Sequence, residues 1–377
     1  MKTIGKKLRT LLECILVVVV GGLLIALINR IPEDDSPKVK NIIFLIGDGM
    51  GISHITATMI EQDYAPLALE RAEYIGLQKT YSANNLITDS AAAGTALSTG
   101  SKTYNGAIGV DLTKKSVENI REVAEKLGMA TGVVATYAVT HATPASFVGH
   151  VENRNDQETI AEQFIYSDID VFFGGGWRYF ADRKDDRYLI DSLTEHDYVV
   201  GTNFNDIEYL REGKAAVMVA EKGLPSKLNG RGSFLPDATT RALEILTANA
   251  KAAKSGFFLM VEGSQIDGEA HGNNIDGVIA EIRDFDEAVR VAFDYADAHA
   301  GTLVVVTADH ETGGLTIINN NDRFDVAQNP IKYHFSTGGH SGGMVPIFAY
   351  GAGADAFSRV LENTDIPHIM KSLLTEK

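Results

Sequence analysis

The chain lacks a second cysteine, an internal repeat, a low-complexity segment and any cluster of positive charge beyond its first residues. Its only cysteine is Cys14, so no disulfide can form within the rest of the chain. The 34 lysines and arginines are outnumbered by 50 acidic residues, which gives a formal charge of −16. A groove for nucleic acid needs clustered cations that neutralise phosphates, so this composition argues against nucleic-acid binding.

Only one apolar run approaches the length that a membrane-spanning helix needs. Residues 1–10 form a basic flank, residues 11–29 are almost entirely apolar, and residues 30–39 form a polar linker. A run of this length approaches the roughly 20 residues that span a bilayer, and no small-x-small cleavage site follows it. We predict a signal anchor, with a basic cytoplasmic flank and the domain that follows exported to the periplasmic or extracellular side. A cleaved signal peptide that releases a soluble exported protein is the alternative.

Residues 40–377 have the pattern of a single α/β domain. Strand-like apolar runs alternate with helical patterns, which favours a mostly parallel sheet with helices on both faces. The spacing of apolar residues predicts one helix over about 274–299, and a second that begins near Asp237, just after Pro236. Residues 172–233 are polar and weakly periodic, so we predict that they leave the sheet.

Carboxylates and histidines follow several of these apolar runs. In open α/β sheets, ligands collect outside the carboxyl ends of the strands, so residues far apart in sequence can converge there. Gathered carboxylates repel one another unless a cation is bound. A hydrolytic metal site is therefore the first hypothesis for these side chains: Asp48, His141, Glu262 with Asp267 and His271 just beyond it, Asp309, His310 and His340.

Two local patterns carry more specific chemistry. Ser90 follows Asp89 and opens an alanine-rich helix, where free backbone N–H groups favour an anion. Asp267 and His271 are four residues apart and so share a helix face, with His340 as a possible third ligand of a zinc-type site. The plain alternatives are an N-cap for Ser90 and ordinary structural roles for each lone Asp or His.

Six motifs, in order, resemble the alkaline phosphatases. They are GDGMG at 47–51, TDSAAAGTA at 88–96, HATPA at 141–145, EGSQID at 262–267, TADHETGG at 307–314 and GGHSGG at 338–343. The resemblance implies a three-layer α/β/α sandwich, usually as a homodimer, with two zinc ions and one magnesium ion. It implies broad hydrolysis of phosphate monoesters, with release of inorganic phosphate, through a phosphoserine on Ser90.

The same resemblance implies a role for each site residue. Asp267, His271 and His340 look like the first zinc site, and Asp48, Asp309 and His310 like the second. Asp48 would also bridge to the magnesium site, which Thr143 and Glu262 complete. Arg154 is similar to the arginine that clamps two phosphate oxygens.

Two positions depart from the family pattern. His141 stands where some members have Asp, so it would reach magnesium through water. Gly268 stands where others place a Lys or Trp, which predicts a more open pocket. Two other functions remain open: a phosphodiesterase or sulfatase of the wider superfamily, and a non-catalytic protein that binds phosphate or stores metal. The presence of Ser90, Thr143 and Glu262 together argues against both.

Overall fold

A single large sheet dominates the chain. The computed structural model describes residues 38–319 and 331–375, and residues Lys38–Lys377 form one compact unit. The predicted membrane segment, its basic flank and the linker as far as residue 37 lie outside the described residues and stay predictions. Among the residues that are described, no helix is long and apolar enough to cross a membrane.

The sheet has ten strands in the order β14-β2-β13-β8-β1-β7-β3-β4-β6-β5. Within the described residues, β13 is antiparallel to both of its neighbours, and the other pairs are parallel. The strands are β1 (Asn41–Gly47), β2 (Tyr74–Lys79), β3 (Ala130–Ala138), β4 (Val171–Gly175), β5 (Tyr198–Gly201), β6 (Lys214–Met218), β7 (Phe257–Gly263), β8 (Thr302–Thr307), β13 (Val345–Gly351) and β14 (Val360–Glu362).

The central strands are buried on both faces, which explains their unbroken apolar sequences. In β1, Ile42, Phe44 and Ile46 pack into one core cluster, whereas Ile43 and Leu45 pack into the other. Successive side chains of a strand point to opposite faces of the sheet, which places these residues in two separate clusters. Both clusters therefore need a covering layer of helices.

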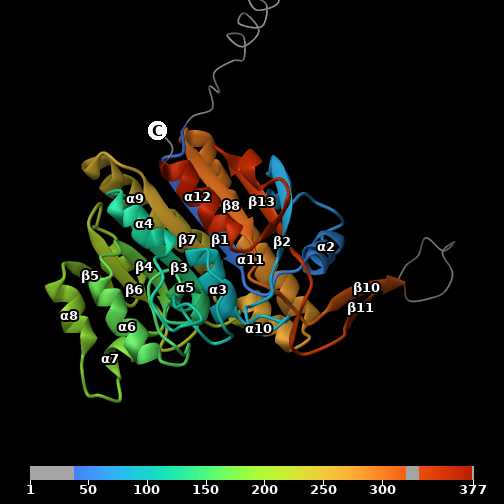
Figure 1. The fold of residues 1–377 in the computed structure, drawn as a ribbon, viewed down its shortest axis with the longest axis horizontal. Coiled ribbons are helices and arrows are strands. Elements are labelled where there is room, and N and C mark those ends of the chain that lie inside the picture. Colours follow the sequence, from blue (N-terminus) through green and yellow to red (C-terminus); the bar gives the residue numbers. More distant parts are fainter. Residues whose placement is uncertain (1–37, 320–330, 376–377) are drawn as a thin grey trace, which may run out of the picture. The chain divides into compact units, whose positions relative to one another are not determined.

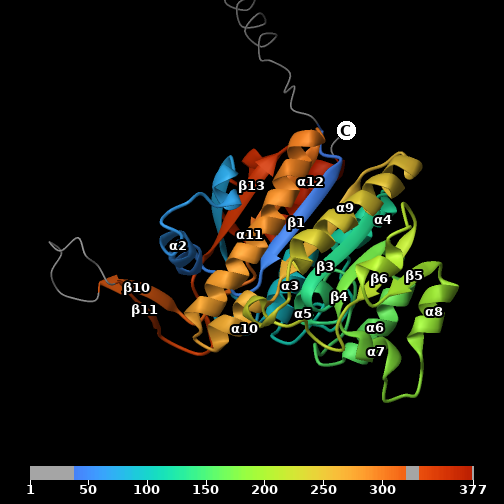
Figure 2. The ribbon, with the colours of Figure 1, turned by 180° about the vertical axis from the view of Figure 1, so that it is seen from behind.

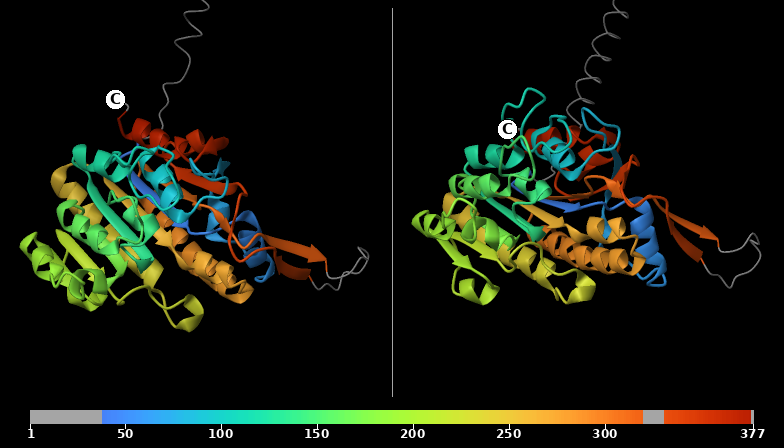
Figure 3. Two further views of the ribbon diagram at one scale, coloured as in Figure 1. Left: turned by 60° about the horizontal axis from the view of Figure 1, so that its bottom comes forward. Right: turned by 90° about the horizontal axis from the view of Figure 1, so that it is seen from below.

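Helices cover both faces, as Figures 1 and 2 show from opposite sides, and the right-hand view of Figure 3 shows the sheet between the two layers. One layer holds α3 (Ser90–Thr99), α4 (Ile120–Lys126), α5 (Ala142–Ala145), α6 (Gln157–Tyr166), α7 (Trp177–Ala181), α8 (Leu189–Glu195) and α12 (Asp365–Thr375). The other holds α2 (Ile52–Ile60), α9 (Phe234–Ala253), α10 (Gln265–His271) and α11 (Ile275–Ala298). The predicted α/β/α sandwich is confirmed.

Short elements complete the described chain. Four 3-10 helices are η1 (Ala68–Arg71), η2 (Phe204–Ile207), η3 (Lys227–Asn229) and η4 (Ala354–Phe357). Strands β9 (Glu311–Thr312) and β12 (His340–Ser341) pair with each other beside the central sheet. Strands β10 (Leu315–Asn319) and β11 (Ile331–Phe335) form a hairpin that extends away from the sandwich (Figure 1).

Two predictions about elements need correction. Residues 172–233 do not leave the sheet, because most of β4 and all of β5 and β6 lie in this range and form one edge of it. The polar composition reflects the edge position and the long connections between short strands. Helix α9 begins at Phe234, three residues before Asp237, because Pro236 fits the first turn, where its missing N–H is not needed. The predicted helix over 274–299 is confirmed as α11.

Candidate functional site

Four adjacent strands bring most of the predicted site residues together. Strands β8, β1, β7 and β3 are neighbours in the centre of the sheet. Their register places Ile46 of β1 beside Glu262 of β7 and beside Thr307 of β8, so the three strands end at the same level. Asp48 follows β1, and Asp309 and His310 follow β8, so their side chains meet at one edge of the sheet.

Three groups of side chains offer ligand atoms within 4.8 Å of one another. We call them the first, second and third clusters. They are Asp267, His271 and His340 in the first, Asp48, Asp309 and His310 in the second, and Asp48, His141 and Glu262 in the third. Asp48 therefore bridges the second and third clusters. The first and second clusters have the members that the sequence resemblance implies, whereas the third contains His141 in place of Thr143.

The second cluster concentrates negative charge in the interior. Asp48 is 1% exposed, and Asp309 and His310 are fully buried. Burial raises the pKa of Asp48 well above its usual range, and the nearby charges of Asp309, Asp267 and Glu262 raise it further. Carboxylates so placed must either take up protons or share a cation.

Several buried ligand atoms have no protein partner. Within the described residues, hydrogen-bond partners are lacking for Asp48 Oδ1 and Oδ2, His141 Nδ1, Thr143 Oγ1, Glu262 Oε1 and Asp309 Oδ2. Buried polar atoms are nearly always hydrogen-bonded, because an unmet one costs roughly 1–3 kcal/mol. Oxygen and imidazole nitrogen donors of this kind suit zinc and magnesium. The donor set therefore fits the two metals that the family resemblance implies.

In the third cluster, the pKa values of one carboxyl group and one imidazole are displaced from their usual ranges. Burial raises the pKa of Glu262 to about 7, and burial together with the charge of Arg154 lowers the pKa of His141 to about 4. His141 is thus a neutral imidazole at physiological pH. Thr143 lies on α5, which packs against β7, the strand that carries Glu262.

In the first cluster, the Nε2 atoms of His271 and His340 converge on one point. His271 Nδ1 lies 2.7 Å from the Gly338 carbonyl oxygen, and His340 Nδ1 lies 2.8 Å from that of Thr88, so each Nδ1–H donates outward. The two Nε2 atoms are 3.2 Å apart, beside the carboxylate of Asp267. Nε2 lone pairs cannot face each other at this distance without a proton or a cation between them.

Thr312 links the first and second clusters, a role that the sequence did not single out. Its hydroxyl donates to Asp267 Oδ1 at 2.5 Å and lies 3.2 Å from His310 Nδ1. Since that hydroxyl has a single proton, His310 Nδ1–H must donate to it. The lone pair of His310 Nε2 is therefore directed at the second cluster, 3.5 Å from Asp48 Oδ1 and 3.2 Å from Asp309 Oδ2.

Ser90 opens α3, but it is not the cap of that helix. Asp89 is the N-cap, and its side chain accepts from the Ala92 N–H at 3.0 Å. The Ser90 hydroxyl is left to face the second cluster, with Oγ 3.2 Å from His310 Nε2. Ser90 is 2% exposed, at the helix N-terminus where an anion is favoured.

Arg154 is held beside Ser90 by two partners. Its guanidinium donates to Asp89 Oδ2 and to His141 Nε2, both at 3.1 Å. Asp89 therefore both caps the serine helix and orients the arginine, a role that the sequence did not single out. His141 accepts from Arg154 through Nε2, so its neutral ring carries the proton on Nδ1, and this buried N–H faces the third cluster as a donor.

Gly268 lies on α10 between Asp267 and His271, where it is exposed. A Cβ added there would find only Gln265 Oε1 at 4.0 Å, so neither packing nor backbone geometry requires glycine. The open surface agrees with the prediction that the pocket is wide at this position.

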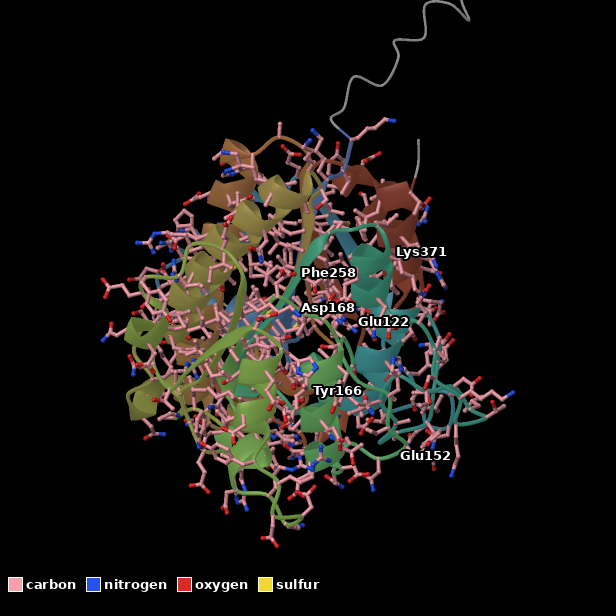
Figure 4. The ribbon with its side chains drawn as sticks, turned by 90° about the vertical axis from the view of Figure 1, so that its left-hand side faces the viewer. Glu122, Glu152, Tyr166, Asp168, Phe258 and Lys371 are labelled. Carbon is pink, nitrogen blue, oxygen red and sulfur yellow. The ribbon has the colours of Figure 1, made fainter. Side chains whose placement is uncertain are left out.

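A separate cavity of about 560 Å³ lies over α4 and the end of α6. Figure 4 shows Glu122, Tyr166 and Asp168 on this side of the molecule. The lining also includes Glu118 and Glu125, and none of its described residues belongs to the three clusters. Arg121, Lys126 and His150 lie among these carboxylates, and the cavity contains none of the grouped ligand residues, so the three clusters remain the candidate active site.

An α/β/α sandwich that gathers three such clusters at the carboxyl edge of its sheet has the architecture of the metal-dependent hydrolases. The sequence model of the family described as alkaline phosphatase matches residues 39–329. Alkaline phosphatase 3 of Bacillus subtilis (strain 168) is 34% identical and covers 90% of each chain. The chain belongs to the alkaline phosphatase family, and it is a phosphomonoester hydrolase.

Solved structures agree with this assignment. The alkaline phosphatase from the Antarctic bacterium TAB5 is 40% identical and has a TM-score of 0.84, over 90% of this chain and 99% of that one. A histidine-to-aspartate variant of the TAB5 enzyme, solved with Mg bound in its M3 site, is also 40% identical, with a TM-score of 0.83 and the same coverage.

Proposed function

We propose that this enzyme hydrolyses phosphate monoesters of broad structure through a phosphoserine on Ser90, with zinc at the first and second clusters and magnesium at the third. The observation that carries the proposal is the Ser90 hydroxyl, which faces buried carboxylate oxygens that have no hydrogen-bond partner among the described residues. Magnesium in the solved TAB5 variant supports a magnesium site in this fold.

Asp267, His271 and His340 would hold one zinc ion, and Asp48, Asp309 and His310 the other. Asp48, Thr143 and Glu262 would hold magnesium, with His141 behind an intervening water. Bound metals would supply Lewis acidity, which lowers the pKa of a hydroxyl or water and neutralises charge on phosphate oxygens.

The protein's own groups account for the remaining chemistry. Ser90 Oγ attacks phosphorus in line with the leaving alkoxide, the P–O bond to that alkoxide breaks, and water later cleaves the phosphoserine. The N-terminus of α3 stabilises the transferring phosphoryl group. Arg154, fixed by Asp89, presents its planar fork to two phosphate oxygens. The open surface at Gly268 leaves the leaving group largely uncontacted, which supports broad specificity.

Arg154→Ala tests the choice of a monoester over a diester. A monoester dianion offers two non-bridging oxygens to the guanidinium, whereas a diester carries one charge fewer and turns an ester oxygen toward the same space. We expect the variant to lose about 2 to 4 kcal/mol in monoester kcat/KM and clearly less for a diester. Steady-state kinetics with matched chromogenic esters measure both losses, and inhibition by inorganic phosphate should weaken in parallel. Equal losses would favour a phosphodiesterase.

Zinc binding should depend on pH through His271. Its hydrogen bond with Asp267 raises the pKa of metal-free His271 to about 9, so the ring is protonated at neutral pH. A metal ligand must be deprotonated, so below pH 9 zinc has to displace this proton, and above pH 9 it does not. We expect zinc affinity at this site to rise roughly tenfold per pH unit up to about pH 9 and then level off. Competition with a zinc chelator across pH 6–10 measures the slope, and a flat profile would contradict the assignment.

We further propose, from the family resemblance, that the enzyme works as a homodimer and is exported behind its N-terminal apolar segment. The homodimer and the exported location stay predictions.

A further inference from the structure

Glu311 directly follows His310 of the second cluster but belongs to none of the three clusters. Its side chain is about 10% exposed. Oε1 accepts from the Leu315 N–H at 3.1 Å, and Oε2 accepts from the Gly314 N–H at 3.2 Å. The hydroxyl of Ser341 also donates to Oε2. Glu311 therefore ties its own loop to strand β12.

Besides its own loop and strand β12, the Glu311 side chain also packs against the loop that contains Gly51. A Cβ on Gly51 would stand 2.4 Å from Glu311 Cγ, so the carboxylate stem occupies the space that any larger residue would need. The Gly51 N–H donates to His54 Nδ1 at 3.0 Å, which places the ring proton on Nε2. That buried N–H lies 3.8 Å from Glu311 Oε1, an electrostatic contact longer than a hydrogen bond.

These three loops carry ligands of the first and second clusters. Asp48 lies three residues before Gly51, His310 directly precedes Glu311, and His340 directly precedes Ser341. Backbone pairing adds to the link, since Ser341 is opposite Glu311 and His340 is opposite Thr312 in the β9–β12 pair. One carboxylate thus contacts three of the segments that carry ligands, whereas Asp267 and His271 come from a fourth, α10.

We propose that Glu311 is a positioning residue that keeps the three ligand-bearing loops in register and so sets how tightly zinc is retained. The inference rests on the proposed zinc sites. Side chains behind metal ligands orient them, and mutation of such partners typically weakens metal binding 10- to 100-fold. A carboxylate that only stabilised the fold would change thermal stability and leave zinc affinity unaltered.

Glu311→Gln in the full chain tests this, because it keeps the shape of the side chain and replaces one acceptor oxygen with a donor. Zinc affinity and the rate of zinc release are measured by competition with a chromogenic chelator, together with the Tm of the metal-free protein. We expect roughly 10- to 100-fold weaker zinc binding. Ser341→Ala removes one donor to Glu311 and should weaken binding about fivefold, the value of one net hydrogen bond.

Asp286→Asn is the matched control. Asp286 is also a buried carboxylate, 4% exposed, and it accepts from the N–H groups of Ala68 at 2.7 Å and Leu69 at 2.9 Å. Its replacement should lower the Tm and leave zinc affinity at the wild-type value.

The outcomes separate the inference from the proposed function. Wild-type zinc affinity in both Glu311→Gln and Ser341→Ala would overturn the positioning role, and so would an equal loss in Asp286→Asn. If Glu311→Gln does not fold, Ser341→Ala alone decides between these results. A wild-type protein that takes up no zinc would overturn the proposed metal sites and this inference with them.

Discussion

Replacement of Ser90 with alanine should lower kcat for a chromogenic phosphate monoester by several orders of magnitude, roughly 10³- to 10⁶-fold. The change removes the one hydroxyl at the head of α3 that faces the second cluster, 3.2 Å from His310 Nε2. Metal content and fold should persist, because no ligand atom of the three clusters is removed. Kinetics and metal analysis by mass spectrometry on the same preparation measure both effects.

Ser98→Ala provides a matched control for this variant. Ser98 lies on the same buried helix, and its hydroxyl donates to the Thr95 carbonyl oxygen at 3.3 Å, away from the clusters. It should keep wild-type kcat. Retention of more than a tenth of wild-type kcat by Ser90→Ala would refute its role as nucleophile.

Removal of metal should abolish activity, and zinc plus magnesium together should restore it. The physical reason is the buried charge of the second and third clusters: without cations, burial drives Asp48 and Glu262 toward their protonated forms. Prolonged dialysis against a chelator, followed by an assay and by readdition of each metal alone and of both, measures the requirement.

His340→Ala should cost one zinc ion per chain, because it removes one of the two nitrogens that converge in the first cluster. His334→Ala is the control, since His334 is exposed on β11 and belongs to none of the three clusters. Full activity after long incubation in excess chelator would contradict the metal requirement. Equal zinc loss in both variants would contradict the ligand assignment.

The centre of the fold and the clusters were predictable because a single physical rule governs both. Strands buried on two faces read as apolar runs, and side chains at their carboxyl ends converge whatever their distance in sequence. Asp48, Glu262 and Asp309 follow this rule, so their meeting required no knowledge of the strand order. The pairing of Asp267 with His271 followed equally simply from the repeat of a helix.

The edges of the sheet were not predictable in this way. Strands β5 and β6 have only four and five residues, and they lie within a polar segment whose pattern resembles that of loops. Strand β5 is the edge strand and is partly solvated, which weakens its apolar periodicity, whereas β6 is buried between β4 and β5 but is too short to show a period.

The residues that orient the site were also hidden in the sequence. Thr312 and Glu311 appeared only as letters of the motif TADHETGG, and Asp89 only as the neighbour of Ser90. Their roles depend on which side chain faces which loop, and this is fixed by tertiary contacts such as the hydrogen bond from Thr312 to Asp267. Local pattern carries no information about such contacts.

The central claim is that a phosphoryl group passes through Ser90, and trapping it is the most direct test. The metal-loaded enzyme is mixed with a monoester that carries radioactive phosphate and is quenched in acid, in which phosphoserine is stable. The protein is then digested and its labelled peptide sequenced. We expect one label, on Ser90, which is absent from Ser90→Ala. Turnover without covalent label, or a label on any other residue, would contradict it.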